Sequence, residues 1–334
     1  MALAVTMGDP AGIGPELLLA AWSARKQHHL PAFYVLADPA MMRARARLLG
    51  VNVPIVECAP EAASDSFDTA LPVFALENTA AHGIGAQAPA SPAAVVEAIE
   101  TAVTHIRDRR ASGVVTAPIT KKSLYEAGFA FPGHTEFLGA LSERFWPGAP
   151  ADPVMMLSGP DLRTVPVTVH IPIADIPAAW TVERICTVAR ITARDLKERF
   201  GISSPRLALA GLNPHAGEGG TIGMEDETVS RKAVAILRAE GIDITGPHPG
   251  DTLFHARARK QYDTALCAYH DQALIPVKTI AFDETVNVTL GLPFVRTSPD
   301  HGTAFDIAGK GIARPDSLIA AIRLADTLAK GATG

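Results

Sequence analysis

The sequence predicts an α/β fold with two lobes and mainly parallel sheets, and three observations support this prediction. Short apolar runs alternate with amphipathic helical segments along the chain, as they do when helices cover parallel sheets. Polar and glycine-rich segments follow several of the apolar runs, which is where open α/β sheets bind ligands. The 334 residues are 48% hydrophobic, enough to form the cores of two domains.

The first half of the chain carries clear start signals for strands and helices. Strands are expected at residues 2–7, 33–37 and 114–116. Pro15 suits the first position of a helix that runs through Trp22, because its fixed φ is already helical. Ser91 and Pro92 are expected to cap and open a second helix with one apolar stripe. Residues 79–92, rich in Ala, Gly and Pro, are expected to form a loop.

The second half of the chain repeats this alternation. Strands are expected at residues 154–157, 163–170, 207–210 and 264–269. Helices are expected at 181–200, 226–240 and 317–330. Thr181 is a candidate cap for the first of these helices, and Gly201 and Gly241 are the expected stops of the first two.

Charge and cysteine content restrict the kind of partner and the compartment. The net charge is −5 and the 30 basic residues form no stripe, so we expect no nucleic-acid partner. The three cysteines, Cys58, Cys186 and Cys267, form no CxxC pair, and we expect buried structural thiols in a reducing cytosol. The N-terminal segment lacks a basic region, and no apolar stretch is long enough to span a bilayer, so a cytoplasmic protein without a membrane partner is expected.

Three histidines each follow an apolar strand, and this makes them candidate metal ligands. They are His170, His215 and His270. Neutral imidazoles suit Zn, Co, Ni or Mn, and three protein ligands leave positions open for a substrate. An open divalent metal polarises a hydroxyl and the carbonyl that forms from it, which hydride removal requires. Separate structural histidines explain the same pattern, and their spacing does not decide between the two hypotheses.

A glycine-rich segment surrounds the second of these histidines. Residues 211–223 hold several glycines, including Gly217 and Gly219, which permit positive φ and close approach of the backbone to a ligand. Such a loop can hold an anion or a dinucleotide, although it is not the GxGxxG fingerprint. The alternative is a generic flexible loop.

Candidate anion-binding residues occur at three further places. His134 and Thr135 stand at an expected helix start, where free amides attract phosphate or carboxylate. Lys278 and Arg296 lie within apolar segments, so each needs an anionic partner, which is a substrate or a structural carboxylate. Asn287 adds a neutral amide near them in sequence.

The last candidate segment is residues 300–311, where glycines bracket His301 and Asp306 without any regular period. It is expected to form a tight loop leading into a helix, with Gly302 allowing close approach to a ligand.

Five boxes, in order along nearly the whole chain, resemble the 4-hydroxythreonine-4-phosphate dehydrogenase (PdxA) family. They are residues 7–16 (MGDPAGIGPE), 133–137 (GHTEF), 213–218 (NPHAGE), 269–272 (YHDQ) and 287–302. The segment from His301 to Gly309 also resembles the cofactor loop of the isocitrate and isopropylmalate dehydrogenases, whose two-lobed fold the family shares. Thr120 and Gly250 depart from the family pattern, which leaves the fine substrate preference open.

The resemblance implies specific roles for the candidate residues. The metal ligands would be His170, His215 and His270, binding Zn, Mg, Co or Mn at the interface of a homodimer, with ligands drawn from both subunits. The substrate-binding residues would be His134, Thr135, Lys278, Asn287 and Arg296. The residues of the NAD or NADP site would be Gly217, Gly219, His301, Gly302 and Asp306.

The reaction implied is NAD(P)-dependent oxidation of the C3 hydroxyl of 4-phosphohydroxy-L-threonine. The β-keto acid then loses CO2 to give 3-amino-2-oxopropyl phosphate, a precursor of the pyridoxine ring. Asp251 and Lys278 are the candidates for the proton relay, although either can instead bind phosphate or orient a ligand.

The shared fold implies that both ends of the chain belong to one lobe. We expect a first lobe of residues 1–130 and 297–334, a second lobe of residues 131–296 with the dimer interface, and an active site in the cleft between the two.

Two other functions remain open at this stage. Relatives in this family oxidise the 4-phosphates of D-threonate or D-erythronate, which lack the amino group. A non-oxidative acyl-phosphate transferase on a related scaffold, or a binder without turnover, is a more distant alternative.

Overall fold

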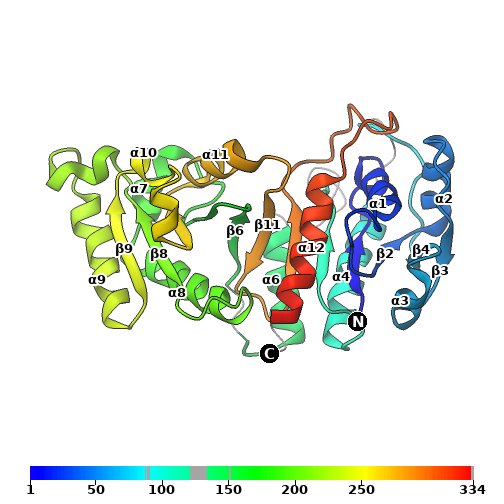
Figure 1. The fold of residues 1–334 in the computed structure, drawn as a ribbon, viewed down its shortest axis with the longest axis horizontal. Coiled ribbons are helices and arrows are strands. Elements are labelled where there is room, and N and C mark those ends of the chain that lie inside the picture. Colours follow the sequence, from blue (N-terminus) through cyan, green and yellow to red (C-terminus); the bar gives the residue numbers. More distant parts are fainter. Residues whose placement is uncertain (87, 89–90, 121–133, 150–151, 332–334) are drawn as a thin grey trace. The chain divides into compact units, whose positions relative to one another are not determined.

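The computed structural model describes residues 1–86, 88, 91–120, 134–149 and 152–331, and for His134 and Thr135 the backbone alone. The chain divides into two compact units. Unit 1 consists of Met1–Pro153 and Leu292–Lys330, and unit 2 contains Val154–Gly291. Each unit is an α/β layer structure (Figure 1). Within the described residues, no helix is both long and apolar enough to cross a membrane.

Unit 1 contains a six-stranded sheet in the order β3-β4-β2-β1-β5-β12. Its strands are β1 (Leu3–Thr6), β2 (Phe33–Ala37), β3 (Ile55–Glu57), β4 (Leu71–Ala75), β5 (Val114–Thr116) and β12 (Arg296–Pro299). Every neighbouring pair is parallel. β1 is buried along its whole length, as expected for a central strand covered on both faces.

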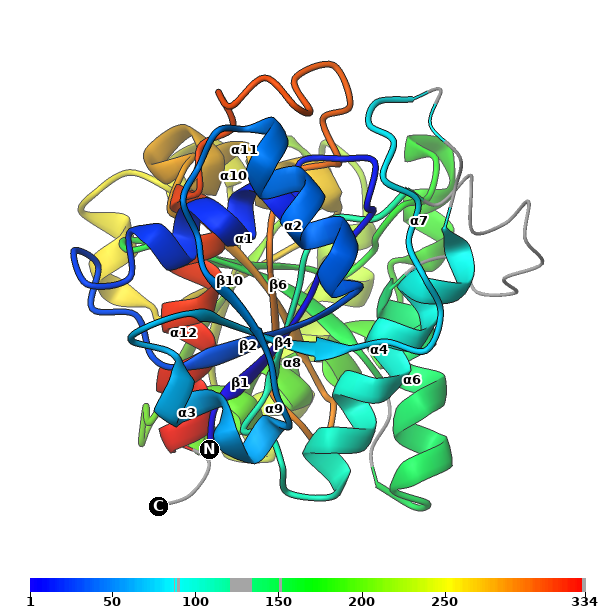
Figure 2. The ribbon, with the colours of Figure 1, turned by 90° about the vertical axis from the view of Figure 1, so that its right-hand side faces the viewer.

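The helices of unit 1 cover both faces of this sheet. They are α1 (Gly14–Ser23), α2 (Pro39–Leu48), α3 (Ala63–Ser66), α4 (Pro92–Arg107), α6 (His134–Phe145) and α12 (Asp316–Gly331), with a short 3₁₀ turn η1 (Pro60–Ala62). Figure 2 shows α4 and α6 on one side of the strands and α12 on the other. Ser91 precedes α4 without capping it, because its Oγ accepts instead from the N–H of Ala81 at 2.8 Å.

Unit 2 contributes six hydrogen-bonded strands in the order β11-β6-β7-β10-β8-β9. Its strands are β6 (Val154–Ser158), β7 (Arg163–Pro166), β8 (Arg206–Ala210), β9 (Asp243–His248), β10 (Thr264–Cys267) and β11 (Val286–Leu290). β11, β6 and β7 pair antiparallel, whereas β7, β10, β8 and β9 are mutually parallel. The prediction of an α/β fold with mainly parallel strands is therefore confirmed.

Among the helices and turns of unit 2, the sequence predicted only α8 and the region of η4 and α9. These helices and turns are η2 (Ile173–Asp175), α7 (Ile176–Ala179), α8 (Val182–Glu198), η3 (Pro214–Gly220), η4 (Asp226–Ser230), α9 (Arg231–Ala239), α10 (Gly250–Leu253), η5 (Ala258–Gln261) and α11 (His270–Ala281). Thr181 caps α8, because its Oγ1 accepts from the N–H of Arg184. The helix predicted at 226–240 begins with the π-helical turn η4, and α11 was not predicted because Pro276 lies inside it.

The division between the units differs from the sequence-based boundaries at 130/131 and 296/297. It falls after Pro153 and before Leu292 instead. α6 belongs to unit 1 because it packs against α4, and the Trp146 ring that follows it lies 5.4 Å from the ring of Phe294. Periodicity in the sequence does not report such packing, and the predicted boundary at 130/131 lies outside the described residues.

All three cysteines are free thiols. Cys186 and Cys267 are buried as expected, and burial raises the pKa of both thiols. Cys58 is only partly buried, which corrects the prediction for this residue.

Candidate active site

Four parallel strands of unit 2 bring several of the candidate residues to one edge of the sheet. The strands are adjacent in the order β7, β10, β8 and β9, and their carboxyl ends share one edge. The segments that follow them carry, in the same order, His170, His270, His215 and Asp251. Because neighbouring strands are about 4.8 Å apart, this topology gathers groups that are far apart in sequence, such as residues 170 and 270.

His170 and His270 lie side by side. Their ring centroids are 5.4 Å apart, and the rings are tilted by 41°. His170 is held in the left-handed region with a φ of 51°. The strand before it ends at Pro166 rather than at His170, but the chain continues along β10, because the N–H groups of Val167 and Thr168 donate to carbonyls of residues 267 and 268.

His270 is oriented by its neighbour in sequence. Its Nδ1 lies 2.7 Å from a carboxylate oxygen of Asp271. In the neutral ring this contact places the proton on Nδ1, so that Nε2 keeps its lone pair for a ligand. A carboxylate behind an imidazole is the common support of a metal-binding histidine. The chemistry of this pair therefore fits a divalent metal.

His215 lies in a left-handed stretch of backbone within η3. The φ angles of residues 215 to 219 are 53°, 52°, 76°, 44° and 67°. Glycine accepts such angles readily, whereas each non-glycine residue there costs about 1–2 kcal/mol. His215, Ala216 and Glu218 all bear this cost. Strain of this kind persists where the surrounding structure enforces it, and it is concentrated at functional sites.

Asp226 enforces the conformation of this loop. Its carboxylate accepts from the N–H groups of Leu212 at 3.0 Å and Asn213 at 2.9 Å. It also accepts from the hydroxyl of Ser230 at 2.8 Å, and that oxygen in turn accepts from the indole N–H of Trp180. Asp226 is completely buried, so the contacts that fix the start of the loop are shielded from water.

Gln272 connects the His215 loop with the beginning of α11. Its amide nitrogen donates to the carbonyl of Gly211 at 3.0 Å, and its amide oxygen accepts from the N–H of Ala268 at 2.6 Å. One side chain thus sets the spacing between the segments that carry His215 and His270. No local pattern in the sequence marks Asp226 and Gln272 as supports, because the loop atoms that they bind, at residues 211–213, are distant from them in sequence.

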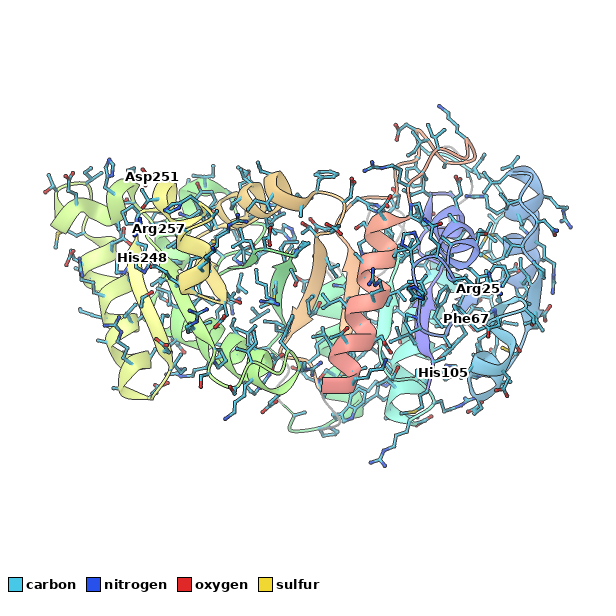
Figure 3. All side chains as sticks on the ribbon, in the orientation of Figure 1. Arg25, Phe67, His105, His248, Asp251 and Arg257 are labelled. Carbon is cyan, nitrogen blue, oxygen red and sulfur yellow. The ribbon has the colours of Figure 1, made fainter. Side chains whose placement is uncertain are left out.

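The two candidates for the proton relay lie on different elements of unit 2. Asp251 is exposed on α10, after the end of β9 (Figure 3). Lys278 lies on α11, partly buried, with its ammonium 5.5 Å from the centre of the Phe282 ring. Lys278 is two turns beyond His270, about 12 Å along the helix axis. Asn287, in the middle of β11, is also partly buried.

Unit 1 carries the predicted cofactor loop, which follows β12. His301 is partly exposed, Gly302 and Asp306 are exposed, and the His301 ring contacts the Gly302 carbonyl at 3.0 Å. The loop packs closely on the N-terminal box, since the N–H of Ile13 donates to the carbonyl of Thr303 at 3.0 Å.

A buried ion pair between Glu16 and Arg45 stabilises this loop. Glu16 accepts from the N–H of Gly309 and pairs with Arg45, whose side chain is 2% exposed, at 3.1 Å. The Arg45 guanidinium also donates to the carbonyls of Gly12 at 2.9 Å and Pro10 at 2.7 Å. Burial lowers the pKa of Arg45, and Glu16 opposes that effect. The contacts of residues 7–16 therefore stabilise the conformation of the 300–311 loop.

Arg296 has partners inside unit 1. Its guanidinium donates to the hydroxyl of Thr116 from Nε at 3.1 Å and from Nη2 at 2.7 Å. Burial lowers its pKa to about 10, and the charge of Asp300 opposes the shift. Arg296 thus holds β5 and β12 together in this chain, whether or not it also meets an anionic substrate.

Two further candidates, His134 and Thr135, lie at the start of α6. α6 begins at His134, as predicted, but the side chains of His134 and Thr135 lie outside the described residues. Among the described residues, no three His, Cys, Asp or Glu side chains of one chain are placed to hold a metal ion together. His170 and His270 are paired, and His215 does not complete a three-residue cluster with them.

Comparison with protein families gives a match over most of the chain. Residues 29–325 match the family described as pyridoxal phosphate biosynthetic protein PdxA. A 4-hydroxythreonine-4-phosphate dehydrogenase of Methylorubrum populi is 57% identical over 330 residues, covering 98% of this chain and 94% of the relative.

Solved structures agree with this match. A 4-hydroxythreonine-4-phosphate dehydrogenase from Klebsiella pneumoniae superposes with a TM-score of 0.83 at 34% identity, covering 98% of this chain and 99% of that one. A terephthalate 1,2-cis-dihydrodiol dehydrogenase from Burkholderia xenovorans has a TM-score of 0.64 at 28% identity, with 98% of both chains covered. Two dehydrogenases with different substrates therefore resemble this chain along its whole length.

Proposed function

Because the chain belongs to the PdxA family, we propose that it is a 4-hydroxythreonine-4-phosphate dehydrogenase of pyridoxal phosphate biosynthesis. The observation that carries this proposal is the match over nearly the whole chain at 57% identity. NAD or NADP would accept the hydride removed from the C3 hydroxyl of 4-phosphohydroxy-L-threonine. Loss of CO2 from the resulting β-keto acid would give 3-amino-2-oxopropyl phosphate.

The metal would be held by His170, His215 and His270. The support from Asp271 and the adjacent placement of two imidazoles fit a divalent cation such as Zn, Co, Mn or Mg. When bound, such a cation would polarise the substrate hydroxyl and the carbonyl that replaces it. A homodimer in which the two subunits share these ligands agrees with the absence of a three-ligand cluster among the described residues of a single chain.

Side chains of this protein would bind the substrate and handle its proton. Lys278, Asn287 and Arg296, with His134 and Thr135, would bind the phosphate and carboxylate. Asp251 is exposed at the strand-end edge, so its carboxylate can take up the hydroxyl proton, and Lys278 is the second candidate for this relay. Gly217 and Gly219, with His301, Gly302 and Asp306, would contact the nicotinamide cofactor.

The closest competing proposal keeps the chemistry and changes the substrate. The 4-phosphates of D-threonate and D-erythronate present the same hydroxyl and phosphate without the amino group. The terephthalate dihydrodiol dehydrogenase relative supports the view that this fold accepts more than one hydroxylated substrate. A non-oxidative acyl-phosphate transferase has no support from the chain's similarity to these dehydrogenases.

The decisive experiment follows the absorbance of reduced nicotinamide with each of the three 4-phosphates, with NAD and with NADP. We expect fastest turnover with 4-phosphohydroxy-L-threonine, and loss of turnover with a chelator that is restored by Zn or Mn. Turnover confined to the two sugar acids would transfer the protein to the competing activity, and absence of turnover with all three would contradict both.

A matched pair of variants tests the metal ligands separately from turnover. His270→Asn should weaken metal binding at least about 10-fold. His29→Asn is the control, because His29 is exposed in unit 1 and Asn tolerates its φ of 50°. Equal metal affinity in the two variants would remove His270 from the ligand set.

A further inference from the structure

Unit 2 contains a cavity of about 360 Å³ that the proposed reaction does not use. Its polar lining comes from Thr245 and His248 of β9, Thr252 of α10, and His255, Arg257 and Gln261 after it. We call it the β9 pocket. Its volume is within the usual range of small-molecule sites, about 300–1,000 Å³. None of the candidate catalytic, metal, substrate or cofactor residues lines it.

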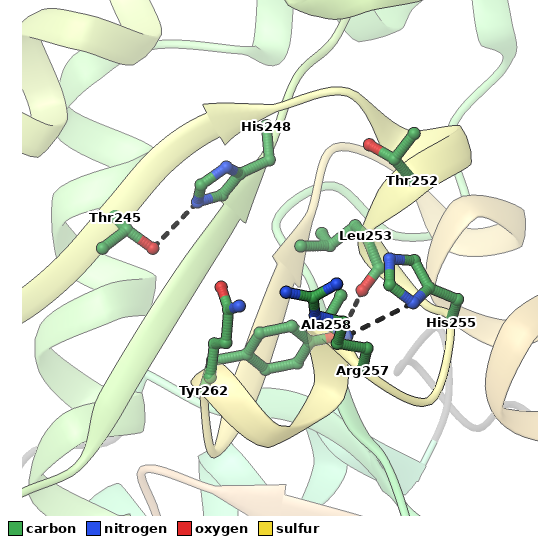
Figure 4. Close-up of a pocket in the computed structure, with 9 residues that line it drawn as sticks. Thr245, His248, Thr252, Leu253, His255, Arg257, Ala258 and Tyr262 are labelled. Carbon is green, nitrogen blue, oxygen red and sulfur yellow. Dashed lines mark hydrogen bonds between the residues drawn. The ribbon is translucent and has the colours of Figure 1, made fainter.

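The lining of the β9 pocket is rich in hydrogen-bond donors and contains no carboxylate. Arg257 supplies a permanent positive charge and a planar set of donors. Its guanidinium projects toward the space between His255 and Tyr262 (Figure 4). Arg257 makes no hydrogen bond or ion pair with the described residues, so its donors are available to a ligand.

The two histidines approach the pocket from different elements. His248 Nε2 lies 2.8 Å from the hydroxyl of Thr245, and burial lowers the pKa of His248, with Arg238 adding to the shift. His255 Nδ1 accepts from the N–H of Ala258 at 3.4 Å, so its neutral ring carries the proton on Nε2. The second nitrogen of His255 is therefore a donor, and Figure 4 shows the two rings on separate sides of the pocket.

One wall of the pocket is apolar. Leu253 and Tyr262 are 5% and 7% exposed, and Ala258 lies beside them. The Tyr262 hydroxyl is already used, because it donates to the carbonyl of Leu253 at 2.9 Å. The ring therefore offers a flat apolar surface rather than a polar group, which suits the organic part of a ligand.

We propose that the β9 pocket binds a small phosphate monoester, at a site separate from the strand-end site. A phosphate group presents three oxygens in different directions, which matches the donors of Arg257, His255 and Gln261 in the segment after α10. The Thr252 hydroxyl of α10 already donates to the carbonyl of Pro249 at 3.3 Å, so it is not counted among these donors. A carboxylate presents two oxygens in one plane and would use only part of this lining. Arginine binds phosphate through two parallel N–H donors, and the apolar wall would contact the carbon skeleton.

The test uses the full-length protein, inorganic phosphate as the probe and the ring C–H signals of ¹³C-labelled histidines. His248→Asn and His255→Asn assign the two signals among the 11 histidines. Phosphate is added at constant pH and ionic strength, and acetate is added in a parallel titration. We expect both signals to shift saturably with phosphate, with half-saturation at about 1–10 mM.

Two substitutions connect the signal to the pocket. Arg257→Gln should weaken phosphate binding about 10-fold, because a charge-assisted hydrogen bond is lost. Lys260→Gln removes the same charge from an exposed residue that does not line the pocket, and it should leave binding unchanged. Lys278→Ala disables the proposed strand-end phosphate site, and it too should leave the His248 and His255 shifts unchanged.

The other outcomes overturn the proposal. They are the absence of saturable shifts, equal shifts with acetate, and equal weakening by Arg257→Gln and Lys260→Gln. Loss of the shifts in Lys278→Ala would assign the phosphate to the strand-end site alone. Enzyme turnover is not measured in this experiment. A negative result therefore does not contradict the proposed dehydrogenase activity, and absence of that activity would not contradict phosphate binding in the β9 pocket.

Discussion

Each unit holds one candidate ligand-binding loop with a buried carboxylate, but the two carboxylates are satisfied in different ways. Glu16 in unit 1 pairs with the guanidinium of Arg45 and accepts from a loop amide. Asp226 in unit 2 accepts only neutral donors, which are two backbone N–H groups and the hydroxyl of Ser230. Both carboxylates support a loop that the family resemblance assigns to ligand binding.

This difference determines what is lost when a hydrogen-bond or ion-pair partner of each carboxylate is removed. In unit 1, loss of one ion leaves the other buried without its counter-charge, which is strongly destabilising. In unit 2, loss of one neutral donor removes only one of three hydrogen bonds to the same carboxylate. We therefore expect damage at the Glu16 pair to affect the stability of unit 1, and damage at Asp226 to affect mainly the geometry of the His215 loop.

The largest expected effect comes from Arg45→Met. It leaves Glu16 buried and unpaired and frees the carbonyls of Gly12 and Pro10, so unit 1 should lose about 3–5 kcal/mol of unfolding free energy. Urea unfolding, with hydrogen exchange to localise the loss to unit 1, measures it. Glu16→Gln in the same chain should recover part of the loss.

The control for this change is Arg43→Met, which breaks an exposed pair. Arg43 and Glu57 lie 2.9 Å apart with side chains 42% and 52% exposed, so the loss should stay below about 1 kcal/mol. Equal losses in the two arginine variants would show that burial of the Glu16 pair does not set its energetic importance.

The second-largest expected effect is a loss of unfolding free energy at low pH, caused by His105 of unit 1. This residue is 3% exposed, its Nδ1 lies 2.8 Å from the Tyr34 hydroxyl, and burial lowers its pKa to about 4. Unfolding restores a pKa of about 6.5, so the unfolded chain binds the proton first. The stability contribution is complete above pH 6.5 and is lost as the pH falls toward 4, with a total of about 3 kcal/mol.

His105→Gln removes this titration while keeping a hydrogen-bonding group near Tyr34. The slope of unfolding free energy against pH between 6.5 and 4 should become smaller than in the unmodified protein. His29→Asn, at an exposed site, should leave the slope unchanged. An unaltered slope in His105→Gln would mean that other groups dominate the acid response.

Asp226→Asn tests the neutral arrangement in unit 2. The amide nitrogen of Asn replaces one acceptor oxygen and then faces a backbone N–H of the loop, which costs about 1–3 kcal/mol. Hydrogen exchange at Leu212 and Asn213 should accelerate, and metal affinity should fall about 10-fold if His215 is a ligand. The control Glu227→Gln breaks a partly exposed pair with Arg231, in which the Arg231 and Glu227 side chains are 56% and 25% exposed, and it should change neither quantity measurably.

Gln272→Ala should act on geometry more than on stability. Both of its hydrogen bonds end on backbone atoms at the strand-end edge, so the expected loss is about 1 kcal/mol. The loss of metal-binding free energy should exceed this loss of unfolding free energy, because the spacing between the His215 and His270 segments is no longer fixed. Gln27→Ala, at an exposed position in unit 1, is the matched control. Metal affinity equal to that of the control would show that Gln272 has no positioning role.

How far the sequence predicts this arrangement depends on the range of the interactions involved. Local signals succeeded where they act alone: Thr181 caps α8, and β2 and β5 have the predicted bounds. They failed where tertiary packing decides, as at Pro276, which lies inside α11 although proline disfavours helix interiors. The unit boundary after Pro153 also depends on packing, here of α6 on α4.

The candidate site shows the same limit. Apolar strands followed by histidines suggested that His170, His215 and His270 could converge. His170 and His270 do lie side by side, as parallel strand ends that share an edge allow, but His215 forms no three-residue cluster with them among the described residues. The supports were not predictable, since Asp226 accepts from backbone N–H groups 13 and 14 residues away and Gln272 donates to a backbone carbonyl 61 residues away. Glycines 217 and 219 indicated positive φ in the loop, but nothing local indicated that Ala216 and Glu218 would share it.

The smallest expected effect concerns that shared strain. Glu218 is exposed at a φ of 44°, so its side chain contributes little packing while its backbone bears the left-handed cost. Glu218→Gly removes the cost but gives the unfolded chain more freedom, so a net gain of up to about 1 kcal/mol is expected. Glu218→Val, with its branched Cβ, should lose stability instead. If both variants lose stability equally, the Glu218 side chain rather than its backbone angle is what the loop requires.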